Sequence, residues 1–249
     1  MDYTIKESFV LPSHGKIYKV PVEDHVSLRS MTTIEEMKRL SPSDYPYKMM
    51  AEIIDDCLVD KPGISAYDMC LGDYQFLLHK LRIVTYGPEY SMACVCPFCG
   101  ATNNVEVDLS SIEVMEWNDE LTKYLSFTLP RTGKQIELNI QTPRMFDIVA
   151  ERKKNILAKT EGNEDPTLFL TLEELIKSID GQAVDPGKLA MFVRGLPMAD
   201  ANMILKCAEK MNTEVGLNTR VECTCDNCHL KYNTSFRITG EFFGPSVRF

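Results

Sequence analysis

The sequence predicts an α+β fold: a helical N-terminal module, then a zinc ribbon split by an inserted β-hairpin and helical module. Apolar residues recur at helical spacing in the first ninety residues and again beyond residue 143. A C-x-C-x-x-C motif occurs twice, and corresponding cysteines of the two copies are 129 residues apart. The segments expected on this basis are residues 1–90, 91–142, 143–212 and 213–249.

The chain begins with short alternating segments. Residues 1–30 are expected to form strands and loops, broken by the turn-forming stretch "PSHG". Thr32 and Glu35 have the spacing of a capping box, in which each side chain bonds the backbone of the other residue. They predict the start of a short helix over residues 32–40.

Three further helical segments are expected before the first cysteine motif. Residues 47–60 have helical periodicity, and Ser65 can cap a short helical segment after them. Asp73 can cap a longer helix over residues 74–87, which Gly87 would end. The first ninety residues are therefore expected to form a helical unit.

Strand signals follow the first cysteine motif. Residues 103–114 alternate between apolar and polar side chains, as a half-buried strand does. Residues 125–140 read as a hairpin with "RTGK" as its turn. Residues 143–159 then return to helical periodicity and open the predicted helical module.

The rest of the helical module is defined by its start and stop signals. Thr171 and Glu174 form another capping pair, which predicts a helix over residues 171–179 that Gly181 ends. Two more helices are expected to begin at Asp185–Pro186 and at Pro197. The last segment, residues 213–249, returns to β character around the second cysteine motif.

The two cysteine motifs predict a metal site. In each motif the last two cysteines, with two residues between them, can bind one ion from a tight turn as thiolates, and two such turns complete a tetrahedral site. In the first motif Pro97 and Gly100 favour that turn. We expect a structural zinc ion, with disulfides and an iron–sulfur cluster as alternatives. The predicted ligands are Cys96, Cys99, Cys225 and Cys228.

Three residues beside these ligands leave alternatives open. Cys94 and Cys223 are the first cysteines of the two motifs and each lies two positions before the first predicted ligand, so they would lie on the same strand face as that ligand. They can be spare thiols, replacement ligands or a disulfide pair. His229 follows Cys228 directly and can replace a ligand in a Cys3His site.

The other candidate residues have simpler interpretations. Three cysteines lie inside predicted helices, where buried, inert thiols are expected. Three histidines lack partners at ligand spacing and are expected in loops or on the surface. The cysteines are Cys57, Cys70 and Cys207, and the histidines are His14, His25 and His79.

Three further stretches also have simple interpretations. The stretch "TGKQ" lacks the full phosphate-loop pattern and lies in the predicted hairpin, so a nucleotide site is not expected there. Residues 151–155 read as a solvated helix face. The C-terminal aromatic residues can dock into the core or onto a partner; they are Phe242, Phe243 and Phe249.

Composition limits the classes of function. The chain has 36 acidic and 27 basic residues and a net charge of −9, which disfavours non-specific binding to phosphate backbones. We expect protein partners, no nucleic acid and no membrane, because no apolar run reaches membrane-spanning length. The N-terminus lacks a secretory signal pattern, so the protein is expected in a cytosol. No catalytic motif is recognisable, so an enzyme is not expected.

The order of several motifs resembles a known family. The stretches "FVLPSHGKIY", "VSLRSMTTIEEMKRL" and "MCLGDYQFLLHKLRIVTYGPEY" lead into "CPFCG" and "VEVDLSSIEV", and "CDNCH" is followed by "FRITGEFFGPS". This order resembles the baseplate hub proteins of T-even-type contractile-tailed bacteriophages, most strongly over residues 9–112.

The resemblance implies a non-catalytic component of the virion tail baseplate, assembled in the host cytoplasm and present in several copies. Its implied partners are other hub, spike, wedge or tape-measure proteins. Some relatives are tail assembly chaperones, which gives a rival interpretation. A rival from another class is a zinc-ribbon factor that binds nucleic acid, and its affinity would fall steeply with salt. A metallohydrolase would need an accessible zinc-bound water, which four thiolates exclude.

Overall fold

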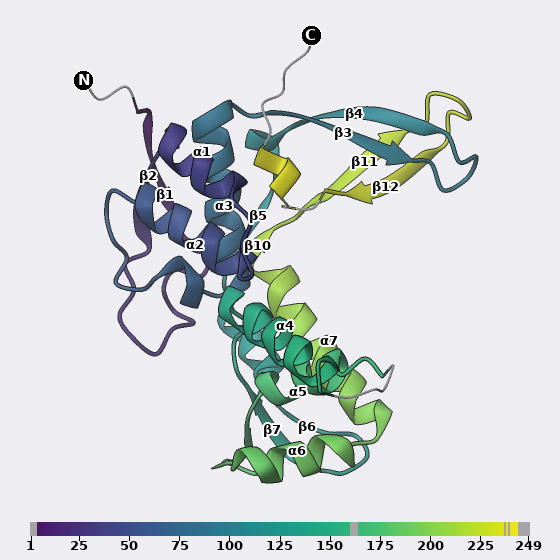
Figure 1. The fold of residues 1–249 in the computed structure, drawn as a ribbon. Helices are drawn as coiled ribbons and strands as arrows, with labels where there is room; N and C mark the ends of the chain where they lie inside the picture. The colour runs from purple at the N-terminus through teal and green to yellow at the C-terminus, as the bar shows by residue number, and fades with distance from the viewer. Residues whose placement is uncertain (1–3, 160–163, 237, 239, 244–249) are drawn as a thin grey trace.

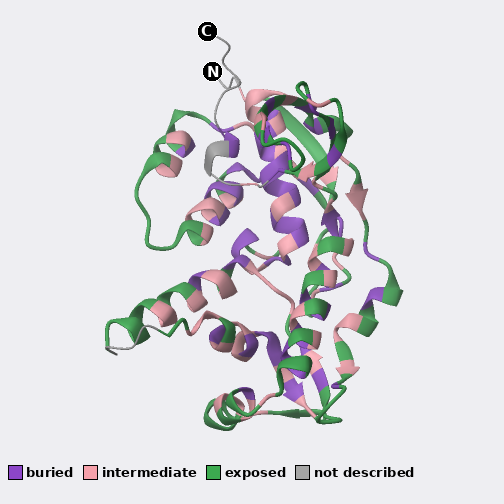
Figure 2. Ribbon diagram, turned by 90° about the vertical axis from the view of Figure 1, so that its right-hand side faces the viewer, coloured by how far each residue is buried: buried purple, intermediate pink, exposed green. Residues whose placement is uncertain are grey.

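The computed structural model describes residues 4–159, 164–236, 238 and 240–243, and these form three parts (Figure 1). The body comprises residues 4–88. The arm comprises residues 89–108 and 220–236 and projects from the top of the body. The lower module comprises residues 119–214 and extends from the opposite end of the body. Buried segments run through the interior of the body and continue into the lower module (Figure 2).

The body packs a strand pair, two helices and a 3-10 turn around a central helix. Its core is apolar and includes Leu77 and Leu81 of that central helix, both fully buried. The elements are β1 (Lys6–Val10), β2 (His25–Arg29), α1 (Thr33–Leu40), α2 (Pro46–Cys57), a 3-10 turn over Ala66–Asp68 and the central α3 (Leu71–Tyr86). β1 and β2 pair antiparallel, with Lys6 opposite Arg29. The strands expected within residues 1–30 are therefore confirmed as this pair, and the helical segments follow them.

The predicted capping box at the start of α1 is confirmed. The Glu35 side chain accepts a hydrogen bond from the Thr32 N–H at 2.7 Å, and Thr32 Oγ1 accepts one from the Ile34 N–H. Arg29 Nη2 donates to Glu35 Oε1 at 2.7 Å. The Arg29 hydrogen bond, followed by those from Thr32, lowers the pKa of the Glu35 carboxyl to about 2. The buried carboxylate thus joins α1 to β2.

Replacing Glu35 with glutamine is expected to lower the free energy of unfolding by about 1 to 2 kcal/mol at pH 7, because the cap and the charged hydrogen bond are both weakened. Since the folded-state pKa is depressed, this contribution is present above the ordinary carboxyl pKa of 4.5 and is lost as the pH falls towards about 2. Urea unfolding between pH 7 and 3 measures it. Glu52→Gln is the control, because its bond to Lys38 is half exposed. Equal losses in the two variants would contradict this role.

The start of α3 differs from the prediction. The helix begins at Leu71 after Cys70, and Asp73 lies inside its first turn instead of capping it. Asp73 is fully buried and accepts hydrogen bonds from the Ser13 N–H at 2.9 Å and from the Tyr18 hydroxyl at 2.6 Å. Its carboxylate therefore holds the loop after β1 against α3. Burial raises the pKa of Asp73.

A close backbone contact joins the body to the end of the lower module. A Cβ atom on Gly72 would lie 2.2 Å from the carbonyl oxygen of Val215, so a side chain has no space there. Gly216 has φ of +117° and lies against Gly72. Gly216 opens β10 (Gly216–Leu217), which pairs antiparallel with β5 (Val114–Met115).

The lower module packs helices on a small antiparallel sheet. The sheet order is β6 (Ser126–Thr128), β7 (Gln135–Leu138), β8 (Ile176–Ile179) and β9 (Gln182–Ala183). The helices are α4 (Pro143–Leu157), α5 (Thr167–Leu175), α6 (Pro186–Arg194) and α7 (Met198–Glu214). The hairpin predicted over residues 125–140 is confirmed as β6 and β7. The starts predicted near Asp185 and Pro197 are also confirmed.

The helix predicted over residues 171–179 is correct for residues 171–175 and wrong at both ends. Thr171 lies in the middle of α5, and residues 176–179 form β8, which pairs with β7. The capping spacing of Thr171 and Glu174 is therefore coincidental. Ile176 is buried on the sheet, and a β-branched residue there favours a strand. Gly181 makes the turn after β8 with φ of +75° and does not end a helix.

The C-terminal region returns to the body. A 3-10 turn over Gly240–Phe243 places Phe242 and Phe243 in the core, 0% and 1% exposed. For these two residues docking into the core is confirmed, whereas Phe249 lies outside the described residues. Within the described chain, none of the helices combines the length and apolar composition needed to cross a bilayer.

Candidate metal centre

Two β-hairpins form the arm. The first pairs β3 (Glu89–Val95) with β4 (Thr102–Asp108), and the second pairs β11 (Arg220–Thr224) with β12 (Lys231–Ser235). The strand predicted over residues 103–114 therefore ends at Asp108 and is followed by a 3-10 turn. The turns of both hairpins lie together at the far end of the arm (Figure 1).

The inner faces of the hairpins form a small apolar core. Side chains alternate along each strand, so that Cys94 and Cys223 point inwards with Tyr232. Asn103, 3% exposed, joins the two hairpins: its Nδ2 donates to the Tyr232 hydroxyl at 3.2 Å, and its Oδ1 accepts from the Asp226 N–H at 2.9 Å. We did not predict this role, although Asn103 occupies an inward position of the alternating pattern.

The two hairpin turns have the same backbone hydrogen bonds. The Cys96 N–H donates to the Ala101 carbonyl at 2.9 Å, and the Cys225 N–H donates to the Leu230 carbonyl at 3.1 Å. Gly100 has φ of +72°, as its sequence position predicts, and His229 has φ of +58° at the equivalent position. His229 is thus a turn residue, and its ring nitrogens are not among the converging ligand atoms of the described residues.

The four predicted cysteines meet between these turns. The Sγ atoms of Cys96 and Cys228 are 3.7 Å apart, those of Cys99 and Cys225 are 3.6 Å apart, and all four lie within 4.8 Å of one another. A tetrahedral zinc site with Zn–S bonds of about 2.3 Å places sulfur atoms about 3.8 Å apart. The residues therefore fit a four-thiolate metal site.

The electrostatics of the cluster also favour a cation. Hydrogen bonds from the N–H groups of Cys228 and Asn227 lower the pKa of Cys225 to about 6. At Cys228 the Leu230 N–H favours the thiolate, but burial and the adjacent thiols outweigh it and raise the pKa to about 12. Four thiols so close together cannot all ionise unless a positive charge compensates them.

The leading cysteines lie beside this cluster. Cys94 and Cys223 are 4% exposed, are free thiols, and do not belong to the converging group. Burial and the neighbouring Cys94 thiol raise the pKa of Cys223. Of the three alternatives for this pair, the geometry matches spare thiols packed next to the site.

The remaining candidates lie away from the cluster. Cys57, Cys70 and Cys207 are buried, as predicted. The surface prediction for His79 is wrong: it is fully buried in α3, because this helix is surrounded on all sides, and its ring stacks on that of Phe242. Burial lowers the pKa of His79 to about 4, so it is neutral at pH 7.

Comparison with known proteins gives one result. A family model described as T4 bacteriophage base plate protein matches residues 3–244. Neither the curated proteins nor the solved structures searched contain a match.

Proposed function

Because the chain belongs to the family of T4 bacteriophage base plate proteins and is a component of the virion tail baseplate, we propose that it is a structural subunit of the baseplate's central hub. The observation that supports a structural role is the closed cluster of four cysteines, which joins two hairpins 129 residues apart. A site with four protein ligands leaves no coordination position for water or substrate, so we propose no catalytic activity.

The ion that we propose is zinc, bound by Cys96, Cys99, Cys225 and Cys228. Zinc favours four thiolates in tetrahedral geometry and has no redox chemistry of its own, so it supplies a cross-link. The backbone N–H groups of the turns support the sulfurs, and Asn103 fixes the relative position of the hairpins. The chain's own residues therefore support the sulfurs and set the relative position of the two turns that would hold the ion.

Zinc binding has a simple stoichiometric consequence. We expect one zinc per chain and five reactive thiols when the protein is denatured with its metal retained, because four of the nine cysteines are ligands. Elemental analysis and thiol titration measure both numbers. Chelation should then raise the thiol count to nine. Paired thiols without metal would favour the disulfide alternative, and iron with acid-labile sulfide would favour a cluster.

The hub position is tested on the virion. We expect the chain in mature tails, in several copies, next to other hub, spike, wedge or tape-measure proteins. Electron cryomicroscopy of tails, with mass spectrometry of the same particles, detects its density and its peptides. A chain found on assembly intermediates but absent from mature virions would be an assembly chaperone instead.

A further inference from the structure

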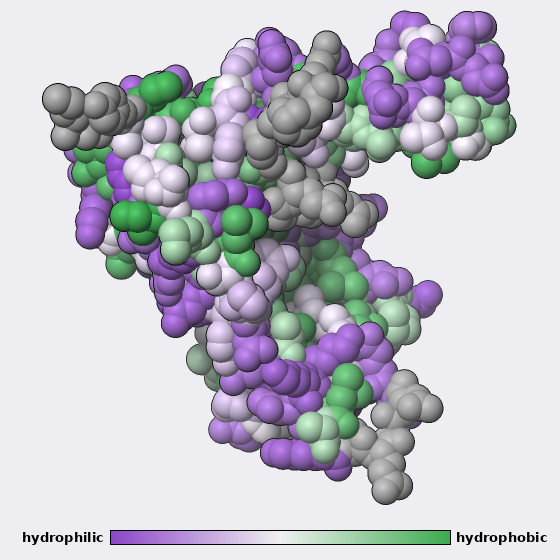
Figure 3. Space-filling view, turned by 45° about the horizontal axis from the view of Figure 1, so that its top comes forward, coloured by the Kyte–Doolittle hydropathy of each residue, from purple (hydrophilic) through white to green (hydrophobic). Residues whose placement is uncertain are grey.

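The far end of the arm carries apolar side chains that the described part of the chain leaves exposed. Val95, Phe98 and Leu230 are 65%, 60% and 49% exposed. We call these three residues, with Asp226, the arm tip. Figure 3 shows the arm standing clear of the body, with hydrophobic surface along one edge. Both hairpins contribute to the tip, so its shape depends on their association.

The four-cysteine cluster fixes the arm tip. Phe98 lies between Cys96 and Cys99, and the carbonyl of Leu230 accepts the Cys225 N–H. The Asp226 N–H donates to Asn103 on the other hairpin. The hairpins therefore hold an apolar surface in a fixed shape, although no other described part of the chain covers it. Exposed apolar surfaces of this kind typically bind a partner.

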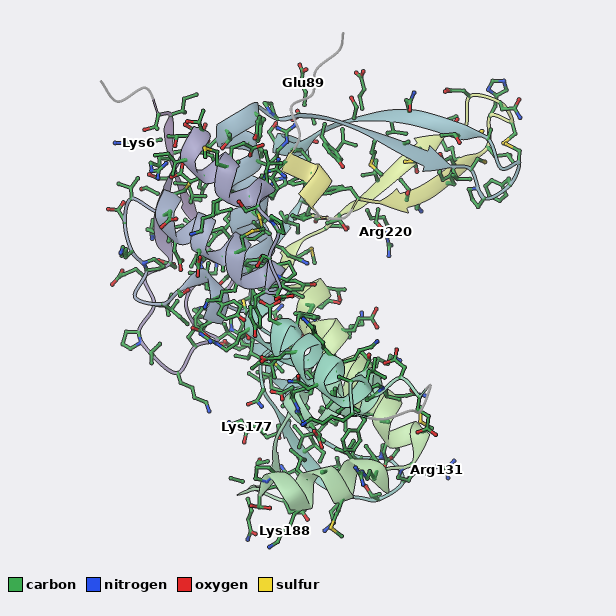
Figure 4. The ribbon with its side chains drawn as sticks, in the orientation of Figure 1. Lys6, Glu89, Arg131, Lys177, Lys188 and Arg220 are labelled. Atoms are coloured by element: carbon green, nitrogen blue, oxygen red, sulfur yellow. The ribbon has the colours of Figure 1, made fainter. Side chains whose placement is uncertain are left out.

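The charge of the arm indicates the chemistry of that partner. Residues 89–108 and 220–236 contain five acidic and two basic side chains. One cation, Lys231, is bonded to Glu222 at 2.8 Å. The other, Arg220, lies at the root of the arm, far from the tip (Figure 4). Four thiolates on a divalent ion add two further negative charges. The three apolar side chains of the tip therefore lie in negatively charged surroundings.

We propose that the arm tip docks into an apolar pocket ringed by Lys or Arg side chains on another baseplate protein. Apolar anchors would supply the central contact, and opposite charges around them would set orientation and association rate. A nucleic acid or an anionic membrane would be repelled by the negative arm, and a second arm would bring like charges together. The geometry of the tip rests on the proposed metal site.

The test measures incorporation into tail precursors that accumulate when the encoding phage lacks this chain. Purified Phe98→Ala and Asp226→Lys proteins, each with wild-type zinc content, are added to these precursors. The precursors are then sedimented, and the amount of added protein that sediments with them is measured. We expect each to be incorporated at least tenfold less than wild type, and wild-type uptake to fall as salt rises. Met191→Ala is the control, because Met191 is 76% exposed on α6 in the lower module and should leave uptake unchanged.

Three results would overturn the proposal. Wild-type uptake by Phe98→Ala and Asp226→Lys would show that the tip makes no contact. Self-association of the free wild-type protein that Phe98→Ala abolishes would make a second copy the occupant. If wild type and Met191→Ala also fail to incorporate, the proposed hub role itself fails. If the zinc-containing wild type is incorporated, the hub role stands, and the two tip variants then test the docking proposal alone.

Discussion

Replacing Cys225 with serine is expected to abolish tight metal binding and to separate the two hairpins of the arm. Cys225 is fully buried, and its sulfur lies 3.6 Å from that of Cys99. Structural zinc contributes roughly 10 to 16 kcal/mol of apparent binding free energy in small peptides. Closing a loop of this length corresponds to about 4 to 5 kcal/mol in the chain-entropy model. Neither hairpin has an apolar core of its own, so each should lose its structure.

The measurement is zinc content with hydrogen exchange. In Cys225→Ser, amides of residues 89–108 and 220–235 should lose protection, whereas those of α3 should keep theirs, because the core of the body does not include the cluster. Cys223→Ala is the matched control: this thiol is also buried in the arm, two residues away, but lies outside the four-sulfur group. A Cys223→Ala protein without zinc, or a Cys225→Ser protein that retains it, would overturn the ligand assignment.

The four-cysteine cluster is predictable because most of the information that specifies it is local. A turn that has two residues between its two cysteines contains both ligands and the residues that set its backbone, so the spacing predicts the geometry. Only the meeting of the two turns is long-range, and the repeated motif indicated it. The same reasoning found the capping box at Thr32 and the hairpin over residues 125–140, both formed within a few neighbouring residues.

The wrong predictions involve partners distant in the sequence. Asp73 has the spacing of a cap, but Ser13 and Tyr18 reach its carboxylate from the loop after β1. Residues 176–179 continue a helical pattern, but β7 offers them a strand partner. The sequence around His79 does not indicate that this residue is buried. Its burial results from the packing of the body and of the C-terminal turn around α3. Local propensity is decisive only where no such contact competes with it.

Arg82 is another residue whose role depends on distant contacts. It is fully buried in α3, and its guanidinium donates to three backbone carbonyls: those of Gly87 at 2.6 Å, Phe242 at 2.9 Å and Glu89 at 3.0 Å. These carbonyls belong to the end of α3, the C-terminal turn and the first residue of the arm. One side chain therefore joins three parts of the chain, and burial lowers its pKa.

Arg82→Met is expected to lower the free energy of unfolding by about 3 to 5 kcal/mol, because methionine fills similar space but leaves these carbonyls without their donor. Arg82→Lys should lose less, since an ammonium keeps the charge but cannot reproduce the planar fork. Urea unfolding measures both losses, and hydrogen exchange should show the turn at Phe242 opening first. Arg131→Met is the control, because its side chain points outwards on the lower module (Figure 4) and should change stability by no more than about 0.5 kcal/mol. If Arg82→Met is as stable as this control, the buried guanidinium does not hold the root of the arm and the C-terminal turn on α3.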